Sequence, residues 1–277
     1  MYMEIIKDEF VIGATEPFKI LQISDLHLNF VSLFDEKRIR KLAKKRKQVY
    51  SHSKNVLKTA SELSKKLNAP IFNTGDMNDF ISRKNLRYIK DFTDNNDCFF
   101  VCGNHDFRPM GGMEYDCEHS RALVFDKVQA LYKNDIMFSA RVINGINFVG
   151  VDDAYYKFSQ KNFDKLKAEV NKGLPIVLLM HIPLYTEDLF YSRVDEKRKY
   201  ASLTAVPDEM MSEYPPKRLQ QQKTDSLTQE VVDYIKKCDT IKLILAGHTH
   251  KRFETVLDGR LPQWVIPIDA IREITFR

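Results

Sequence analysis

Short, almost continuous apolar runs recur along the chain, and between them lie segments in which apolar residues return every three or four positions. Apolar runs of about five residues without alternation are typical of strands that are covered on both faces. The longer spacing is typical of helices with one buried face. The predicted strands are FKILQIS (18–24), APIFNTG (69–75), CFFVCG (98–103), INFVGV (146–151), PIVLLMH (175–181) and IKLILAG (241–247).

Helical patterns separate several of these strands. The first spans 35–67 and leaves open a break near 50–53; the others cover 83–93, 162–172 and 227–237. Strands that alternate with helices predict an α/β fold with much parallel pairing. The last three apolar runs, FETVLD, PQWVIP and IREITFR, are separated only by turns. We therefore expect an antiparallel meander to close the molecule.

Two segments interrupt this alternation. Residues 107–120 contain paired glycines and are expected to form an ordered but mobile loop. Residues 184–222 are charged and rich in aromatic side chains, and a segment of this length inside a compact domain is usually functional or disordered. We expect a single domain over 1–277 in which 184–222 is a lid over the functional site. A disordered insert or a dimer contact is the alternative.

Composition narrows the class of protein. Hydrophobic residues make up 43% and charged residues 29%, which predicts a packed globular core. A net charge of +5 suits an anionic substrate and does not by itself indicate nucleic acid. The run KLAKKRK (41–47) is interpreted as a solvated helix face, with a phosphate-binding or nucleic-acid-binding patch as the alternative.

The expected location is the cytoplasm. The sequence has no apolar run approaching the roughly 18 residues of a membrane span, and its first residues lack the basic-then-apolar pattern of a signal peptide. The four cysteines show no CxxC pairing, which fits reduced thiols. We therefore expect a soluble cytoplasmic protein with no membrane partner.

Polar side chains that can bind metals follow the apolar runs, at the point where each predicted strand ends. Five of the seven histidines lie there, beside aspartates and one asparagine. In α/β proteins this edge of the sheet is where ligands bind, because the loops converge there. The candidates in chain order are Asp25, His27, Asp76, Asn104, His105, Asp106, His181, His248 and His250.

These residue types indicate a metal centre. Imidazole, carboxylate and amide oxygen without thiolate suit Mn, Fe or Zn in five- or six-coordinate sites better than a structural zinc site of the cysteine type. Seven of the candidates are taken as ligands: Asp25, His27, Asp76, Asn104, His181, His248 and His250. Seven ligands are too many for one ion and suffice for two if one carboxylate bridges. The glycines that precede Asp76, Asn104 and His248 let the backbone turn sharply and leave space for a substrate.

The ordered motifs DLH, GD, GNHD, H and GHTH, from about residue 20 to residue 250, resemble those of the calcineurin-like metallophosphoesterase superfamily. The resemblance implies a four-layer α/β/β/α sandwich of two mixed β-sheets flanked by helices, with two divalent or trivalent metal ions. It implies these roles: Asp25, His27 and His250 on one ion, Asn104, His181 and His248 on the other, Asp76 as the bridge, and His105 as an acid oriented by Asp106.

Such a centre is expected to hydrolyse phosphomonoester or phosphodiester bonds, with a metal-bridging hydroxide as nucleophile and His105 as the proton donor. A nuclease is the second hypothesis, because the run 41–47 offers charge without the interleaved aromatic residues that stack on bases. A non-catalytic metal-bound scaffold could dispense with His105 and several ligands. This chain retains all of them, which ranks the scaffold last.

Overall fold

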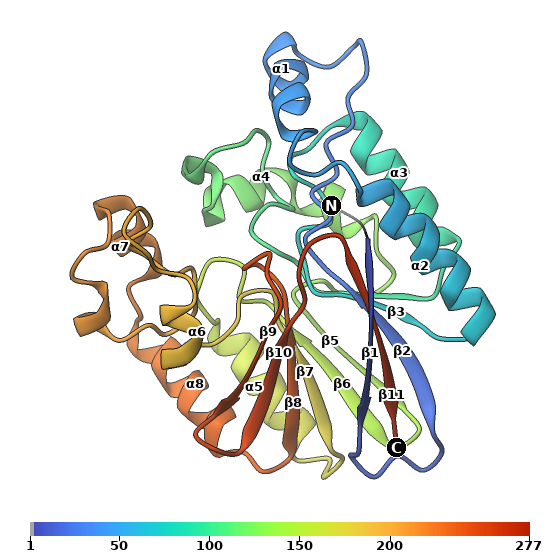
Figure 1. Ribbon diagram of the computed structural model, residues 1–277, viewed down its shortest axis with the longest axis vertical. Helices are drawn as coiled ribbons and strands as arrows, with labels where there is room; N and C mark the ends of the chain where they lie inside the picture. The colour runs from blue at the N-terminus through green and yellow to red at the C-terminus, as the bar shows by residue number, and fades with distance from the viewer. Residues whose placement is uncertain (1–2) are drawn as a thin grey trace.

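Two β-sheets pack face to face and carry helices on their outer sides in the computed structural model, which describes residues 3–277 (Figure 1). The first sheet has the strand order β1-β11-β2-β3-β4, and the second has the order β5-β6-β7-β8-β10-β9. The strands of the first sheet are β1 (Glu4–Phe10), β11 (Ala270–Phe276), β2 (Phe18–Ile23), β3 (Ile71–Asn73) and β4 (Cys98–Phe100). Those of the second are β5 (Phe138–Ile143), β6 (Ile146–Val151), β7 (Ile176–Leu179), β8 (Ile241–Ala246), β10 (Leu261–Val265) and β9 (Phe253–Leu257).

The helices divide between the two sheets. Their bounds are α1 (Lys37–Arg46), α2 (Ser53–Leu67), α3 (Arg83–Asp94), α4 (Glu118–Gln129), α5 (Gln160–Val170), α6 (Glu187–Tyr191), α7 (Pro216–Gln222) and α8 (Ser226–Lys237), with 3-10 turns at Met113–Tyr115 and Asp208–Met211. Buried residues of α2, α3 and α4 pack on the first sheet, and those of α5 and α8 pack on the second. None of the helices in residues 3–277 is long and apolar enough to cross a membrane.

Alternation along the strands builds the layers. Ile71 of β3 packs among α2, α3 and α4, whereas its neighbour Phe72 packs between the two sheets. In the second sheet Leu178 faces α5 and α8, and Val177 faces the first sheet. Because successive side chains of a strand point to opposite faces, an apolar run with both faces covered needs a layer on each side. The predicted four-layer α/β/β/α sandwich of mixed sheets is confirmed.

The predicted strands and helices are present, the break left open near 50–53 is found, and further elements occur that were not predicted. The helical pattern over 35–67 is broken as two helices, α1 ending at Arg46 and α2 beginning at Ser53. Strands β1 and β5 and helix α4 were not predicted, although α4 begins inside the segment 107–120. Both strands alternate between exposed and buried or half-buried positions, so they lack the continuous apolar run used to recognise the others.

The expected antiparallel meander is wrong. β9 and β10 form an antiparallel hairpin, but β10 also pairs in parallel with β8. β11 leaves this sheet and lies in the other one, parallel to β1 and antiparallel to β2. Arg272 of β11 is fully buried and contacts Asp8 and Glu254. The segment IREITFR is therefore an interior strand of its sheet despite its polar residues.

The segment 184–222 is folded. It contains α6, the turn at 208–211 and α7, and its own apolar residues pack against Ala246 and Val265 at the ends of β8 and β10. The Tyr214 hydroxyl donates to the backbone oxygen of Ala201 at 2.9 Å. This arrangement differs from the disordered insert considered as an alternative.

Leu203→Ala tests whether this packing stabilises the protein. Leu203 is 0% exposed within the segment, so removing its side chain is expected to lower the free energy of unfolding by about 2–5 kcal/mol. Leu219→Ala is the control, because Leu219 is 39% exposed in the same segment and is expected to change stability by less than about 1 kcal/mol. Urea unfolding measures both, and equal small effects would contradict an integral role for the segment.

Candidate metal centre

The candidate residues converge because the strands that precede them are parallel neighbours. β2, β3 and β4 run parallel in the first sheet, and β6, β7 and β8 run parallel in the second (Figure 1). Their carboxyl ends face the same end of the sandwich, so loops from both sheets meet there. The structure brings together six of the seven expected ligands in two groups of three.

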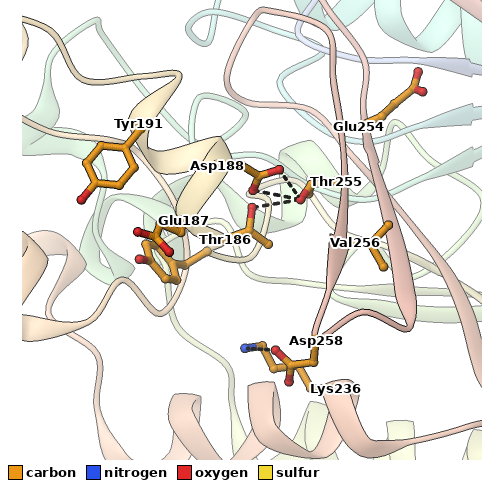
Figure 2. A pocket seen from close by; sticks show the side chains of 10 residues that line it. Thr186, Glu187, Asp188, Tyr191, Lys236, Glu254, Thr255, Val256 and Asp258 are labelled. Atoms are coloured by element: carbon orange, nitrogen blue, oxygen red, sulfur yellow. Dashed lines mark hydrogen bonds and ion pairs between the residues drawn. The ribbon is translucent and has the colours of Figure 1, made fainter.

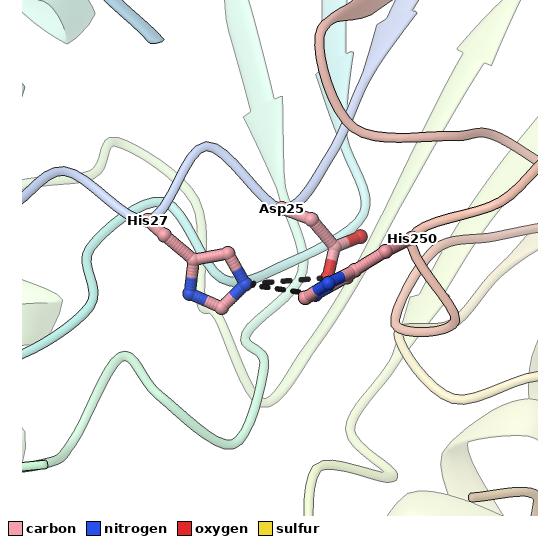
Figure 3. A group of neighbouring side chains, drawn as sticks. All are labelled: Asp25, His27 and His250. Atoms are coloured by element: carbon pink, nitrogen blue, oxygen red, sulfur yellow. Dashed lines mark hydrogen bonds and ion pairs between the residues drawn. The ribbon is translucent and has the colours of Figure 1, made fainter. Parts of the chain in front are cut away.

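The first group consists of Asp25, His27 and His250 (Figure 3). Oδ1 of Asp25 lies 3.3 Å from Nε2 of His250 and 3.7 Å from Nε2 of His27. The two imidazole nitrogens lie 3.0 Å apart. Two ring nitrogens at this distance share one proton at most, or both face a cation. Oδ2 of Asp25 accepts from the Ser24 hydroxyl and from the backbone N–H of His248, which leaves Oδ1 directed at the histidines.

The second group consists of Asp76, His181 and His248. Nε2 of His181 lies 3.1 Å from Nδ1 of His248 and 3.3 Å from Oδ2 of Asp76. The same Oδ2 lies 3.6 Å from Nε2 of His27 in the first group. One carboxylate oxygen of Asp76 therefore lies within reach of both groups, as a bridging ligand requires.

Asn104 has a free amide oxygen. Its Nδ2 donates to Asp116 at 3.3 Å, which fixes the amide orientation. Its Oδ1 is buried and has no hydrogen-bond partner in the described chain, and Oδ1 of Asp25 is in the same state. Buried oxygens without a partner are rare because each loses its hydration. Both oxygens, and the facing imidazole nitrogens, fit the donor set of a bound cation.

The backbone at these residues is strained. Asp25, His27, Asp76, His248 and His250 all have positive φ, between 44° and 67°. Residues other than glycine adopt this region at a cost of about 1 kcal/mol or more, and such positions gather at functional sites. The strain turns each side chain off its strand towards the common centre.

Two glycines make room for the ligands themselves. Gly75 has φ 101°, and a Cβ there would overlap the His181 ring. A Cβ on Gly247 would overlap Ser24 and the Asp25 carboxylate. The space that sequence analysis assigned to a substrate is therefore filled by neighbouring side chains of the centre.

Buried carboxylates dominate the electrostatics. Burial opposes ionisation of Asp76, yet His181 and His105 hold the pKa of Asp76 well below its usual range. Burial also disfavours protonation of His27, but Asp25 and Asp79 raise the pKa of His27 to about 9. Against the same burial, Asp76 raises the pKa of His181 to about 10. Ring protons thus supply positive charge at positions where a bound cation would replace them.

Asp79 joins three parts of the site, and sequence analysis missed it. Its carboxylate accepts from Nε and Nη2 of Arg46, both at 2.6 Å. Its Oδ1 lies 3.3 Å from Nδ1 of His27 and 2.9 Å from Nδ1 of His105. His27, Asp79 and His105 could also hold an ion, but the Arg46 guanidinium already balances the Asp79 charge. Asp79 therefore fits an orienting partner of His27, which presents Nε2 to the first group.

His105 is oriented by a different carboxylate from the expected one. The Asp106 carboxylate accepts from the backbone N–H groups of Gly103, Asp76 and Asn78 at 2.8–3.1 Å, and so braces the turn. Asp79 makes the contact with His105 that was assigned to Asp106, because the two loops after β3 and β4 are adjacent.

Arg108 also contacts the His105 ring. Its Nη1 lies 2.6 Å from Nε2 and 3.0 Å from Nδ1 of His105, and its guanidinium pairs with Asp116. Burial and the Arg108 charge lower the pKa of His105 to about 4. Because a guanidinium only donates, the ring presents an acceptor nitrogen to it in this conformation.

The loop after β6 supports the second group. Asp153 accepts from the backbone N–H groups of His181 at 2.9 Å and Ile182 at 3.0 Å. The Tyr156 hydroxyl lies 3.1 Å from Nε2 of His248, which leaves Nδ1 facing His181. The sequence DDAYY (152–156) directly follows the predicted strand 146–151, so the rule that found the other residues could have found Asp153 and Tyr156.

A separate cavity of about 820 Å³ lies between α6, α8 and β9 (Figure 2). The Thr255 hydroxyl lies 2.9 Å from the Asp188 carboxylate there, and Lys236 pairs with Asp258 at 3.2 Å. Glu187 adds negative charge to the lining, and among the described residues neither Glu187 nor Asp188 has an ion-pair partner, whereas Glu254 pairs with Arg252 and Arg272. Carboxylates without matching cations repel a phosphate ester, so this cavity is a poor substrate site.

Residues 18–252 match the calcineurin-like phosphoesterase family, and the chain belongs to this family. Among curated proteins none matches the sequence significantly. A dimetal phosphatase from Danio rerio has a similar fold, with a TM-score of 0.54 at 12% identity over 93% of this chain and 88% of that one. A purple acid phosphatase from yellow lupin (Lupinus luteus) seeds gives 0.52 at 10% identity, over 91% of this chain and 44% of its own.

Metal stoichiometry tests the shared position of Asp76. We expect about two ions per chain in protein saturated with Mn²⁺, and less of both in Asp76→Asn, because a neutral amide bridges two cations poorly. Metal analysis after gel filtration measures both values. A saturated protein that holds a single ion in a well-formed site would overturn the expectation.

Proposed function

We propose that this protein hydrolyses phosphomonoester or phosphodiester bonds at a dinuclear metal centre. The observation that carries the proposal is the position of Oδ2 of Asp76, within 3.6 Å of His27 in one ligand group and 3.3 Å of His181 in the other. Membership of the calcineurin-like phosphoesterase family supports the same reaction class.

Each ion has its own ligands. Asp25, His27 and His250 would hold one ion, Asn104, His181 and His248 the other, and Asp76 both. Donors of this type suit Mn, Fe or Zn. Two such cations, when bound, would lower the pKa of a bound water and polarise the phosphoryl oxygens of a substrate.

The residues beside the ligands bind and orient the substrate. His105 follows the ligand Asn104, and the Asp79 contact at Nδ1 turns the other ring nitrogen towards Arg108. A phosphate ester that enters here takes over the Arg108 contact and brings its leaving oxygen to His105. Released from Arg108, Nε2 takes up a proton from solvent, which the negative charge of the ester favours, and passes it to that oxygen.

The segment 184–222 is proposed as a lid over this side of the centre. Gln221 of α7 donates to Asp116 at 3.2 Å. Asp116 in turn pairs with Arg108 and accepts from Asn104. Through Asp116, hydrogen bonds and an ion pair therefore connect the segment to the proposed ligand Asn104 and to Arg108, which contacts His105.

A substrate panel tests the function. Protein reconstituted with Mn²⁺ is assayed on an aryl phosphate, a bis-aryl phosphate, cyclic nucleotides and single-stranded DNA. We expect metal-dependent hydrolysis of one of the small esters and none after chelation. Turnover of DNA alone would favour the nuclease, and a metal-loaded protein inactive on every ester would favour a non-catalytic scaffold.

His105→Ala separates proton donation from metal binding. We expect both ions to remain and kcat to fall by about 10²–10⁴-fold on alkyl phosphates, since an alkoxide leaves badly without a proton. Nitrophenyl phosphates should lose little, because their phenolate leaves unaided. Steady-state rates and metal content measure these effects. Equal losses on both ester types, or loss of an ion, would remove His105 from this role.

A further inference from the structure

A second concavity, of about 440 Å³, lies beside the metal centre under α1. Its walls come from the loop after β2, from α1, and from the start of α2 and α3. The lining includes five cationic side chains and, among the residues described, no carboxylate. The cations are Arg40, Lys44, Lys47, Lys54 and Lys84.

One face of α1 supplies much of this charge. Arg40, Ala43, Lys44 and Lys47 line the cavity, and their spacing of three, four and seven residues places them on one side of a helix. Lys44 and Lys47 are exposed at the cavity, whereas the equally exposed Lys41 and Lys45 do not line it. The run 41–47, interpreted from sequence as a solvated face, thus divides into a cavity side and a solvent side.

The cavity cations lack carboxylate partners. The ion pairs within residues 3–277 that involve α1, α2 or α3 are Arg46–Asp79, Lys58–Glu62 and Lys90–Asp94. The five cavity cations take part in none of them. The Lys54 ammonium lies over two ring faces, those of Phe30 at 4.8 Å and Tyr88 at 5.9 Å from the ring centroids. Like charges gathered in one concavity repel each other, and an anion placed among them removes that repulsion.

The start of α2 adds donors to the same wall. Ser53 and Lys54 line the cavity and form its first turn. In the described structure no side chain caps this helix, and its first turn contains no acidic residue. Free N–H groups at a helix start attract anions, and here they act together with the five side-chain cations.

Tyr50 connects the cavity to the metal centre. It lines the cavity, and its ring stacks on His27 with centroids 4.2 Å apart. Its centroid lies 5.8 Å from that of His250. The cavity therefore begins one aromatic ring away from the first ligand group.

We propose that this cavity binds a second phosphate group of the substrate, so that the natural substrate is a small phosphate ester with two phosphate groups several bonds apart. The inference rests on the proposed function, because it takes the reacting phosphate to lie at the metal centre. The Tyr50 ring separates the two positions, which excludes directly adjacent phosphates. A volume of about 440 Å³ suits a small ligand, and the convergence of the cations on one concavity favours it over a nucleic-acid strand.

Bisphosphates of linear diols of increasing length test this inference against the monophosphates of the same diols. On Mn²⁺-reconstituted protein we expect one length of bisphosphate to exceed its monophosphate in kcat/KM by on the order of tenfold, as two partly exposed ion pairs would give. Lys44→Gln/Lys47→Gln should remove this preference. Lys41→Gln/Lys45→Gln, with the same charge change on the solvent side of α1, should keep it.

Two results with the bisphosphates would overturn the inference. One is the absence of any bisphosphate preference at every length in an active enzyme, which leaves the proposed function standing. The other is equal loss in both double variants, which would mean that only the overall charge matters. If turnover of a single-stranded oligonucleotide, rather than of bisphosphates, depends on Lys44 and Lys47, the small substrate is wrong.

Binding without catalysis separates the two proposals. Inorganic pyrophosphate is titrated calorimetrically into metal-free protein from which the chelator has been dialysed. We expect affinity to fall roughly tenfold in Lys44→Gln/Lys47→Gln and to stay unchanged in Lys41→Gln/Lys45→Gln. If affinity falls only in Lys44→Gln/Lys47→Gln but the protein hydrolyses no ester, the anion site is upheld and the proposed function is overturned. Equal affinity in all three proteins would overturn the anion site.

Discussion

Burial of several carboxylates at one edge of two sheets is the constraint on which the rest of this structure depends. Asp25, Asp76 and Asp79 are nearly inaccessible to solvent, and an ionised carboxylate in such surroundings requires a nearby positive charge. Arg46 provides it for Asp79. For Asp25 and Asp76 the charge comes from ring protons or from metal ions, and the neighbouring histidines are suited to both.

This requirement explains local features that are unfavourable in isolation. Positive φ angles at Asp25 and Asp76 strain the backbone but aim both carboxylates at one point. Gly247 lacks a side chain because Ser24 and Asp25 occupy its space. These features lower the stability of the fold at this edge of the sheets. They also bring desolvated donor atoms close together, as tight cation binding requires.

Much of the fold and of the candidate ligand set could be predicted, because the strands and the polar residues that follow them are local features of the sequence. The sequence alone shows the apolar runs and the polar residues that follow them, such as His181. It does not show which side chains from distant parts of the chain contact each other. That Asp79 rather than Asp106 would meet His105 depends on the pairing of β3 with β4. Arg46 looked like one more member of a basic run, since only the folded chain places it against Asp79. The place of β11 depends on partners far away in sequence.

The position of β11 has a consequence for the order of folding during synthesis. Glu4 pairs with Ala270, and β11 separates β1 from β2, so the first sheet cannot close until the ribosome has released residues up to about 276. Until β11 has been synthesised, the edge of β2 that it covers has no partner from this sheet. Contacts between residues so far apart in sequence slow folding and expose the unfolded chain to aggregation.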